Sequence, residues 1–508
     1  MSSRRAAISA LPDDILLIII SYVNVQDILS LRKTSKRFFT MSKLRWVWYD
    51  AIKRHVVEEG LPVPAAAVAD LKALAAEHLE ARAVHAASFH ENWNSAHPVA
   101  KKTFEFCAVN YLDDQLPDDH RSVVTHVSFL PGRNGQYLIT AVGRVLTCWE
   151  VPLGESEAYR VAEWVSAQKI EQVIVNSDPK AEVVVAYVSA HPVTQGVVEC
   201  KALAFDKFHG KFACRMELRA HRQVVMPLHL LHSDYLIFGD PMNVCFLTAP
   251  TMVKPLGKSS LADLPENKVL AVKPLNRYLL IVRQRAFEVI AAPSWMGIRA
   301  SYASLLRVCA HIELDIPASS AVIVARNPSF ASVHELPDWP ADPVTVLARY
   351  SDDGFEVLHQ YDLLPNPKAQ ASAKAESEIA TDRPPCLFPS QYTRIISVAP
   401  SSCDFRVGSS GKGFWTETRN ITLRHARTPA RCLVGFTVRP NPYESGTKDP
   451  ARRTAHLQLC KDTLYTRRCN IHEILWKKYM ISSTALEDTV GRIAVGDVTG
   501  KVEVLDLA

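Results

Sequence analysis

The first long run of apolar residues begins shortly after Pro12 and has no polar break. Ile15 to Ile20 would be apolar on every face of a helix that runs from Pro12 to about Tyr22, which is the pattern of a helix buried on more than one side. Pro12 suits the first turn, where its missing N–H would have been unpaired. Asp13 and Asp14 follow where the helix dipole favours negative charge. The pattern therefore predicts a short, largely buried helix.

Two further helices are predicted in the next forty residues. One runs from Asp27 to Lys36, with Asp27 as its cap or first-turn acid. The other begins near Lys43 and continues to about Glu58, before the glycine and prolines that end it. Large apolar side chains crowd this part of the chain: Phe38, Phe39, Trp46, Val47, Trp48 and Tyr49. Some fifty residues cannot bury so much apolar surface among themselves, so either the chain's own next domain or a partner must cover the remainder.

An amphipathic helix or helix pair is predicted from Ala65 to Phe89, because apolar residues recur there at helical spacing. We expect Trp93 to pack between the helices and the next domain. From about Thr103 the period changes to short runs of branched and aromatic residues separated by Gly, Pro, Asn and Asp, which is typical of antiparallel strands. The expected domains are a helical module at residues 1–60, a helical linker at 61–102 and a β domain at 103–508.

Several strand runs end in similar units, which resemble the end of a WD-type repeat. Units that end at Trp149, Leu247 and Ile290, with a further run near Phe205, are spaced as four-stranded propeller blades with loop insertions would be. The fold class is therefore multidomain α+β, a helical module followed by an all-β propeller of about seven blades, with six or eight possible. Two stacked β-sandwiches are the alternative.

The hairpin from Ile493 to Leu507 is predicted to close the ring. We expect it to complete a blade together with a strand from the region 103–110, because closure removes the exposed sheet edges of a propeller. Two hydrophilic stretches, near 365–385 and 439–453, are predicted to be surface insertions.

The order of residues in the N-terminal helices resembles the F-box family. The matching segments are Leu11-Pro12-x-Asp14-Ile15, Ile19-x-Ser21-Tyr22-Val23, Asp27-Ile28-Leu29-x-Leu31, Ser35-Lys36-Arg37-Phe38 and Val47-Trp48. Asp14 stands where the family usually has Glu, Val25 where it usually has Pro, and Thr34 where Val is common. None of these departures places a charge in an apolar seam or a proline in a helix.

The resemblance implies a three-helix module that binds a Skp-family adaptor and, through it, a cullin-RING ubiquitin ligase. The chain would then recruit a target protein on its propeller. The alternative is a propeller scaffold whose F-box-like helices pack only in cis and recruit no ligase. The adaptor-binding residues that the resemblance implies are Leu11, Pro12, Ile15, Leu16, Ile19, Leu29, Leu31, Ser35, Phe38, Val47 and Trp48.

Composition adds little to this interpretation. Apolar residues make up 48% of the chain and charged residues 22%, which is ordinary for a globular protein. A net charge of +5 gives no case for nucleic acid, and the longest apolar run is far shorter than the roughly 20 residues needed to cross a membrane. The 11 cysteines include no Cys-x-x-Cys, which favours reduced thiols. We therefore expect a cytoplasmic or nuclear protein.

No catalytic set, cofactor site or metal site is predicted. The histidines at 221, 229 and 232 have no carboxylate or cysteine at ligand spacing, and the glycine-rich segment 408–413 lacks the spacing of a phosphate-binding loop and is predicted to be a turn. One basic cluster lies within a predicted strand, turn and strand, where guanidinium groups could bind acidic or phosphorylated groups of a target; a solvated basic edge is the alternative. Its candidate target-binding residues are Arg419, Arg424, Arg427 and Arg431.

Overall fold

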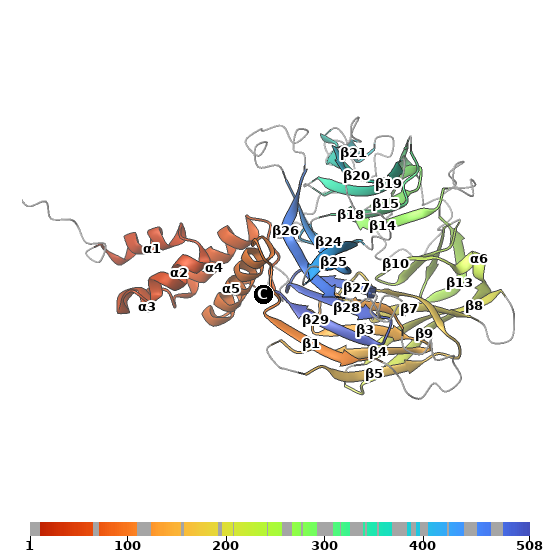
Figure 1. Ribbon diagram of the computed structural model, residues 1–508, viewed down its shortest axis with the longest axis horizontal. Helices are drawn as coiled ribbons and strands as arrows, with labels where there is room; N and C mark the ends of the chain where they lie inside the picture. Colours follow the sequence, from red (N-terminus) through yellow and green to blue (C-terminus); the bar gives the residue numbers. More distant parts are fainter. Residues whose placement is uncertain are drawn as a thin grey trace, which may run out of the picture.

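The computed structural model consists of a helical region beside a larger ring of β-sheets (Figure 1). It describes residues 11–508 except 65–70, 109–122, 154–156, 191–195, 207, 241, 257–266, 276–277, 292–307, 315, 326–338, 341–342, 353–354, 368–383, 388–392, 397–404, 424–425, 441–454 and 469–480. Most of each predicted hydrophilic insertion lies outside the described residues. No described helix is long and apolar enough to span a membrane.

The helical region is built from short helices. They are α1 (Asp13–Ser21), α2 (Val25–Arg32), α3 (Lys36–Met41), α4 (Arg45–Ile52), a π-helical turn (Lys53–Val57) and α5 (Ala76–Trp93). The predicted first helix is confirmed. Of the helix or helix pair predicted from Ala65 to Phe89, the part from Ala76 is confirmed as α5, and its predicted start at Ala65 lies outside the described residues.

The second predicted helix is present as α2 but ends at Arg32 rather than Lys36, and a further short helix, α3, begins at Lys36. Asn24 caps α2, since its side-chain oxygen accepts a hydrogen bond from the backbone N–H of Asp27 at 2.8 Å. Asp27 is therefore a first-turn acid rather than the cap. Ser35 begins α3 in the same way, accepting from the N–H of Phe38 at 3.2 Å. The chain turns between the two helices, where the sequence predicted that the first one continues.

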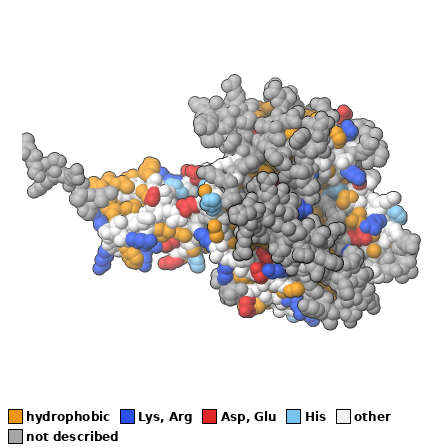
Figure 2. All heavy atoms as spheres, viewed as in Figure 1, with side chains coloured by type: hydrophobic (Ala, Val, Ile, Leu, Met, Phe, Trp, Pro, Cys, Tyr) orange, Lys and Arg blue, Asp and Glu red, His pale blue; other side chains and the backbone are white. Residues whose placement is uncertain are grey.

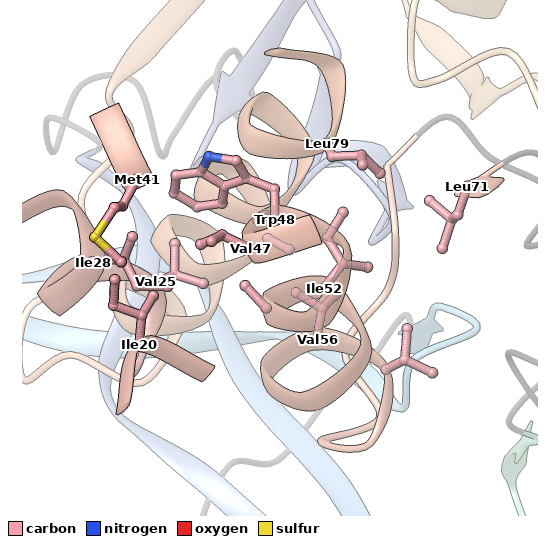
Figure 3. Close-up of a cluster of buried hydrophobic side chains, with 14 of the residues drawn as sticks. Ile20, Val25, Ile28, Met41, Val47, Trp48, Ile52, Val56, Leu71 and Leu79 are labelled. Atoms are coloured by element: carbon pink, nitrogen blue, oxygen red, sulfur yellow. The ribbon is translucent and has the colours of Figure 1, made fainter. Parts of the chain in front are cut away.

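A compact apolar core holds the short helices together (Figure 3). Trp48 lies at its centre with no exposed surface, and its indole N–H donates to the carbonyl of Ser42 at 2.7 Å. Leu79 of α5 belongs to the same core. The Arg32 guanidinium adds a two-pronged bond to the Glu80 carboxylate, at 2.6 and 2.9 Å. These contacts fix α5 against α2 and α4.

Seven antiparallel sheets form the β domain in the described part of the chain. The strands of the first six, in chain order, are β2 (Val124–Phe129), β3 (Tyr137–Val142), β4 (Val145–Glu150) and β5 (Tyr159–Val165); β6 (Ile170–Val175), β7 (Val183–Ala190), β8 (Val197–Asp206) and β9 (Lys211–His221); β10 (Leu228–His232), β11 (Tyr235–Phe238), β12 (Asn243–Phe246) and β13 (Ala249–Pro255); β14 (Val269–Leu275), β15 (Tyr278–Arg283), β16 (Ala286–Ala291) and β17 (Val308–Glu313); β18 (Ser320–Val324), β19 (Val344–Asp352), β20 (Phe355–Pro365), β21 (Cys386–Leu387) and β22 (Thr393–Ile396); β23 (Phe405–Val407), β24 (Lys412–Leu423), β25 (Ala426–Pro440) and β26 (Ala455–Arg468). A short helix, α6 (Arg222–Val225), precedes β10.

The seventh sheet joins strands from both ends of the β domain. It contains β27 (Ile481–Glu487), β28 (Arg492–Asp497) and β29 (Lys501–Asp506), and β1 (Lys102–Cys107) is its fourth strand. β1 pairs antiparallel with β29, from Lys102 opposite Asp506 to Cys107 opposite Lys501. The predicted closure by a strand near residues 103–110 is confirmed.

The first strands of neighbouring sheets contact one another around a complete circle. In order these are β2, β6, β10, β14, β18, β23 and β27, and β27 contacts β2 again. The domain is therefore a seven-bladed β-propeller, and the alternative of two stacked sandwiches is wrong. Its ring has no open edge between the first and last blades.

A buried arginine joins the closing blade to the first one. Arg492 of β28 has no exposed surface and pairs with Asp506 at 3.3 Å. Its remaining N–H groups donate to the carbonyls of Gly135, Val151 and Pro152, at 3.0, 2.5 and 2.9 Å. The buried charge is thus both paired and hydrogen-bonded, as a charge in an interior must be.

The last turns of α5 insert into the propeller between its last two blades. Phe89 and Trp93 are fully buried, and the Trp93 indole N–H donates to the Thr437 hydroxyl at 3.1 Å. Gly491, in the turn between β27 and β28, has a φ of +71°, and a Cβ there would lie 2.5 Å from the Phe89 ring. The predicted packing of Trp93 between the helices and the next domain is confirmed.

Candidate protein-interaction surface

An apolar stripe on α1 is left uncovered by the rest of the described chain. Ile15, Ile18, Ile19 and Tyr22 retain 40%, 53%, 37% and 72% of their surface. Their spacing of three, four and seven residues places them on one face of the helix. The opposite face is buried in the helical core. Figure 2 shows hydrophobic side chains along the edge of the helical region that α1 occupies.

Three more large apolar side chains are exposed on α3 and at the start of α4. They are Phe39, Leu44 and Trp46, with 45%, 44% and 48% of their surface accessible. Trp46 lies two residues before the fully buried Trp48, so the chain places one indole outside the core and one inside. Monomeric proteins seldom gather apolar side chains on one small module unless a partner covers them.

Polar contacts hold α1 and α3 in position. Arg37 of α3 pairs with the carboxylate of Asp13 at the start of α1, and its guanidinium also donates to the carbonyl of Leu11 at 2.6 Å. At the other end of α1, the guanidinium of Arg54 lies 4.8 Å from the ring centre of Tyr22. The exposed residues therefore sit on a fixed scaffold.

Comparison with protein families concerns the same segment. Residues 8–50 match the family model of the F-box domain. The N-terminal helices form an F-box domain. No curated protein matches the chain. Among solved structures, the chain is similar to the WD40 domain of SCAP from fission yeast, with a TM-score of 0.41 and 10% identity over 77% of this chain and 83% of that one.

The candidate residues of the F-box domain fall into different environments. Pro12, Ile15, Ile19 and Ser35 are exposed, and Ser35 serves as the cap of α3. The half-buried candidates are Leu11, Leu29 and Leu31. The fully buried candidates, which form the core of the domain, are Leu16, Phe38, Val47 and Trp48. Buried residues would act on a partner only through the shape of the domain.

Several exposed residues were not among the candidates. They are Ile18, Tyr22, Phe39, Leu44 and Trp46. Helical spacing from Ile15 could have found the first two. The other three depend on where α3 ends and α4 begins, which residue types alone did not indicate.

The predicted basic cluster of the propeller lies on the antiparallel pair of β24 and β25, so the two predicted strands are confirmed, and the predicted turn between them lies outside the described residues. Thr418 faces Arg431 across the hairpin, and Thr422 faces Arg427. The side chains of Arg419, Arg424 and Arg427 lie outside the described residues, and Arg431 is half-buried. Their role in target binding stays a prediction.

The histidines and the glycine-rich segment considered in the sequence analysis make contacts within the fold. The ring of His229 bonds the carbonyl of Gly239 at 2.9 Å, and burial lowers the pKa of this histidine. The predicted turn is present at 408–411, with Gly411 at φ +82° and the N–H of Ser410 donating to Asp488 at 2.5 Å, and residues 412–413 begin β24. Within the described residues, no group of three or more His, Cys, Asp or Glu side chains could hold a metal ion.

Proposed function

We propose that this protein is the substrate-recruiting subunit of a Skp-cullin-F-box ubiquitin ligase. The F-box domain would bind a Skp-family adaptor, and the adaptor would connect the chain to a cullin-RING ligase, with the chain itself performing no catalysis. The observation that carries this proposal is the uncovered stripe of Ile15, Ile18, Ile19 and Tyr22 on a domain whose core is otherwise complete.

Packing of the F-box domain in cis has less support. The helical region meets the propeller through the last turns of α5, where His85 bonds the carbonyl of Val490 at 2.9 Å and Phe89 and Trp93 are buried. In the described chain, the exposed residues of α1 are not covered by the propeller. A partner is therefore the better candidate for the cover.

The propeller would hold the target at the strand ends that point away from α5. The helix lies against the turn between β27 and β28, at one end of the blades. The turn between β28 and β29 lies at the opposite end of the blades. The end of β24 and the start of β25 lie there too. Arg419 and Arg427 belong to this second group of strand ends, so a target there would not compete with α5 for space.

Copurification tests the adaptor proposal. The chain is coexpressed with a Skp-family adaptor, and the double variant Ile15→Ser, Ile18→Ser is compared with Val165→Ser, Val224→Ser. The control pair also removes exposed apolar side chains, of 54% and 44% accessibility, but from the propeller. Central apolar anchors commonly contribute about 2 kcal/mol each, so the first variant should bind roughly a hundredfold or more weakly and the control unchanged. Equal binding by both variants would disprove the proposal.

A further inference from the structure

The F-box domain carries an uninterrupted basic segment. Between Ile28 and Tyr49 the sequence has six Lys or Arg residues and no Asp or Glu. Figure 2 shows blue side chains at the edge of the helical region where α3 lies. A solvated helix usually mixes the two signs of charge, so a run of one sign on a small domain needs an explanation.

The three arginines of this segment are held by the helical region itself. Arg32 pairs with Glu80 and Arg37 with Asp13. Arg45 donates to the backbone carbonyls of Leu74 and Leu71, which precede α5, at 2.8 and 3.2 Å. These side chains have a structural role, and their charges are already matched by acceptors.

The three lysines are different. Lys33, Lys36 and Lys43 are all exposed, and within the described residues none of their ammonium groups makes a hydrogen bond or an ion pair. The Lys43 ammonium instead lies 4.4 Å from the ring centre of Phe39, which is itself 45% exposed. We call Lys33, Lys36 and Lys43 the lysine edge.

Arg37, which follows Lys36 of the lysine edge, connects α3 to the start of α1. It bonds both Asp13 and the carbonyl of Leu11 there. The first turn of α3 therefore lies beside the first turn of the helix that carries the stripe.

We infer that the lysine edge binds acidic side chains on the same adaptor surface that receives the apolar stripe. This inference rests on the proposed function and adds the chemistry of the partner, an apolar groove bordered by carboxylates. Charges at the border of an interface mainly raise the association rate, and salt screens them. The stripe would then set the lifetime of the complex, and the lysines its speed of formation.

Few cations are present for a nucleic-acid or membrane site. Proteins that bind polyanions without sequence preference often neutralise about six to ten phosphates, whereas the lysine edge has three lysines beside exposed Phe39 and Trp46. An apolar border with a few positive charges fits a protein surface better.

Stopped-flow or surface binding kinetics with the full chain and a purified Skp-family adaptor tests the inference. The triple variant Lys33→Glu, Lys36→Glu, Lys43→Glu is compared with Lys169→Glu, Lys180→Glu, Lys211→Glu. The control changes the net charge equally at exposed lysines of the propeller. We expect the first variant to associate roughly tenfold to a hundredfold more slowly at low salt, with an unchanged dissociation rate. The difference should shrink as salt is raised, and the control should behave like the wild type.

Four results would overturn the inference. Equal association rates and salt dependence for the first variant and the wild type would remove the lysines from the interface while leaving the proposed function intact. Equal slowing by both variants would assign the effect to net charge. A wild-type chain that does not bind the adaptor would defeat the proposed function and this inference together. Binding of phosphatidylserine vesicles or DNA that depends on the lysines, with unchanged adaptor kinetics, would assign the edge to another polyanion.

Discussion

Trp46 and Trp48 lie two positions apart, and substituting each one tests a different property, binding for Trp46 and folding for Trp48. Trp48 has no exposed surface and lies in the core of the F-box domain, whereas Trp46 keeps 48% of its surface. Trp48→Ala should cost about 3 to 5 kcal/mol of stability, because it removes a large buried side chain. Trp46→Ala should change stability by less than about 0.5 kcal/mol and weaken adaptor binding. Chemical denaturation and adaptor titration of both variants measure the two effects. A large loss of stability in Trp46→Ala would contradict its placement outside the core.

A half-buried carboxyl in the closing blade makes stability depend on pH. Burial raises the pKa of Glu487 to about 7, and the neighbouring Asp488 carboxylate adds to the shift. Because the folded pKa lies above the unfolded value of 4.5, the folded state binds the extra proton between these values. The contribution of Glu487 to the free energy of unfolding is therefore fully present below about pH 4.5 and is lost as pH rises through about 7.

Glu487→Gln should remove this dependence. Relative to the wild type, the free energy of unfolding of the variant is expected to rise as the pH increases from about 4.5 to about 7. At pH 8 the difference should be on the order of 2 kcal/mol. Urea unfolding at several pH values gives the difference, in which the buried histidines cancel because both proteins contain them. A constant difference across this range would show that Glu487 titrates normally.

The sequence predicted which residues of the first helix are apolar but not which way they face. All of Ile15 to Ile20 are apolar, so no polar position marks the outer side. The structure resolves this through packing, since Leu16 and Ile20 enter the core while Ile15 and Ile18 do not. For the same reason the motif residues Val47 and Trp48 could not be assigned to core or surface from their identity alone.

The hairpin of β24 and β25 is the element on which a target-binding prediction depends. The sequence predicts that Arg419 and Arg427 lie at the surface, where charges contribute little to folding. Reversing both to Glu should therefore abolish capture of a target while leaving adaptor binding and thermal stability nearly unchanged. Arg160→Glu and Arg215→Glu, on exposed strands of the first two blades, provide a control with the same charge change. Pull-down of copurifying proteins, repeated at higher salt, measures the effect. A target retained equally by both variants would place recognition elsewhere on the propeller.

Element boundaries were less predictable than element types. The helix predicted from Asp27 to Lys36 ends at Arg32, because the Ser35 side chain caps a new helix that begins at Lys36. The alanines before Ala76 continue the helical pattern of the sequence, so the pattern does not indicate that α5 begins at Ala76. Strand pairing at the ring closure was predicted correctly, because an uncovered sheet edge is unfavourable wherever the blades end.

Closure of the ring is a property of the whole molecule. Deleting residues 490–508 removes β28 and β29 and leaves β1 without its partner. The propeller should then unfold or aggregate, because the deletion leaves two blade edges without a partner strand. It also removes the Arg492 side chain from the backbone carbonyls of Gly135 and Val151. The F-box domain should still bind the adaptor, since its core is separate from that of the propeller. A soluble, cooperatively unfolding truncated propeller, measured by circular dichroism and gel filtration, would contradict the closed ring.

The pairing of β1 with β29 also imposes an order on events during synthesis. α4 and the apolar stripe leave the ribosome long before β29 exists, by roughly 20 to 90 s at about 5 to 20 residues per second. Throughout that interval β1 has no partner strand, and α5 has no Gly491 turn to receive Phe89. The F-box domain is therefore ready for a partner before the propeller can be finished. The nascent chain would meet its adaptor first and acquire its target-binding ring last.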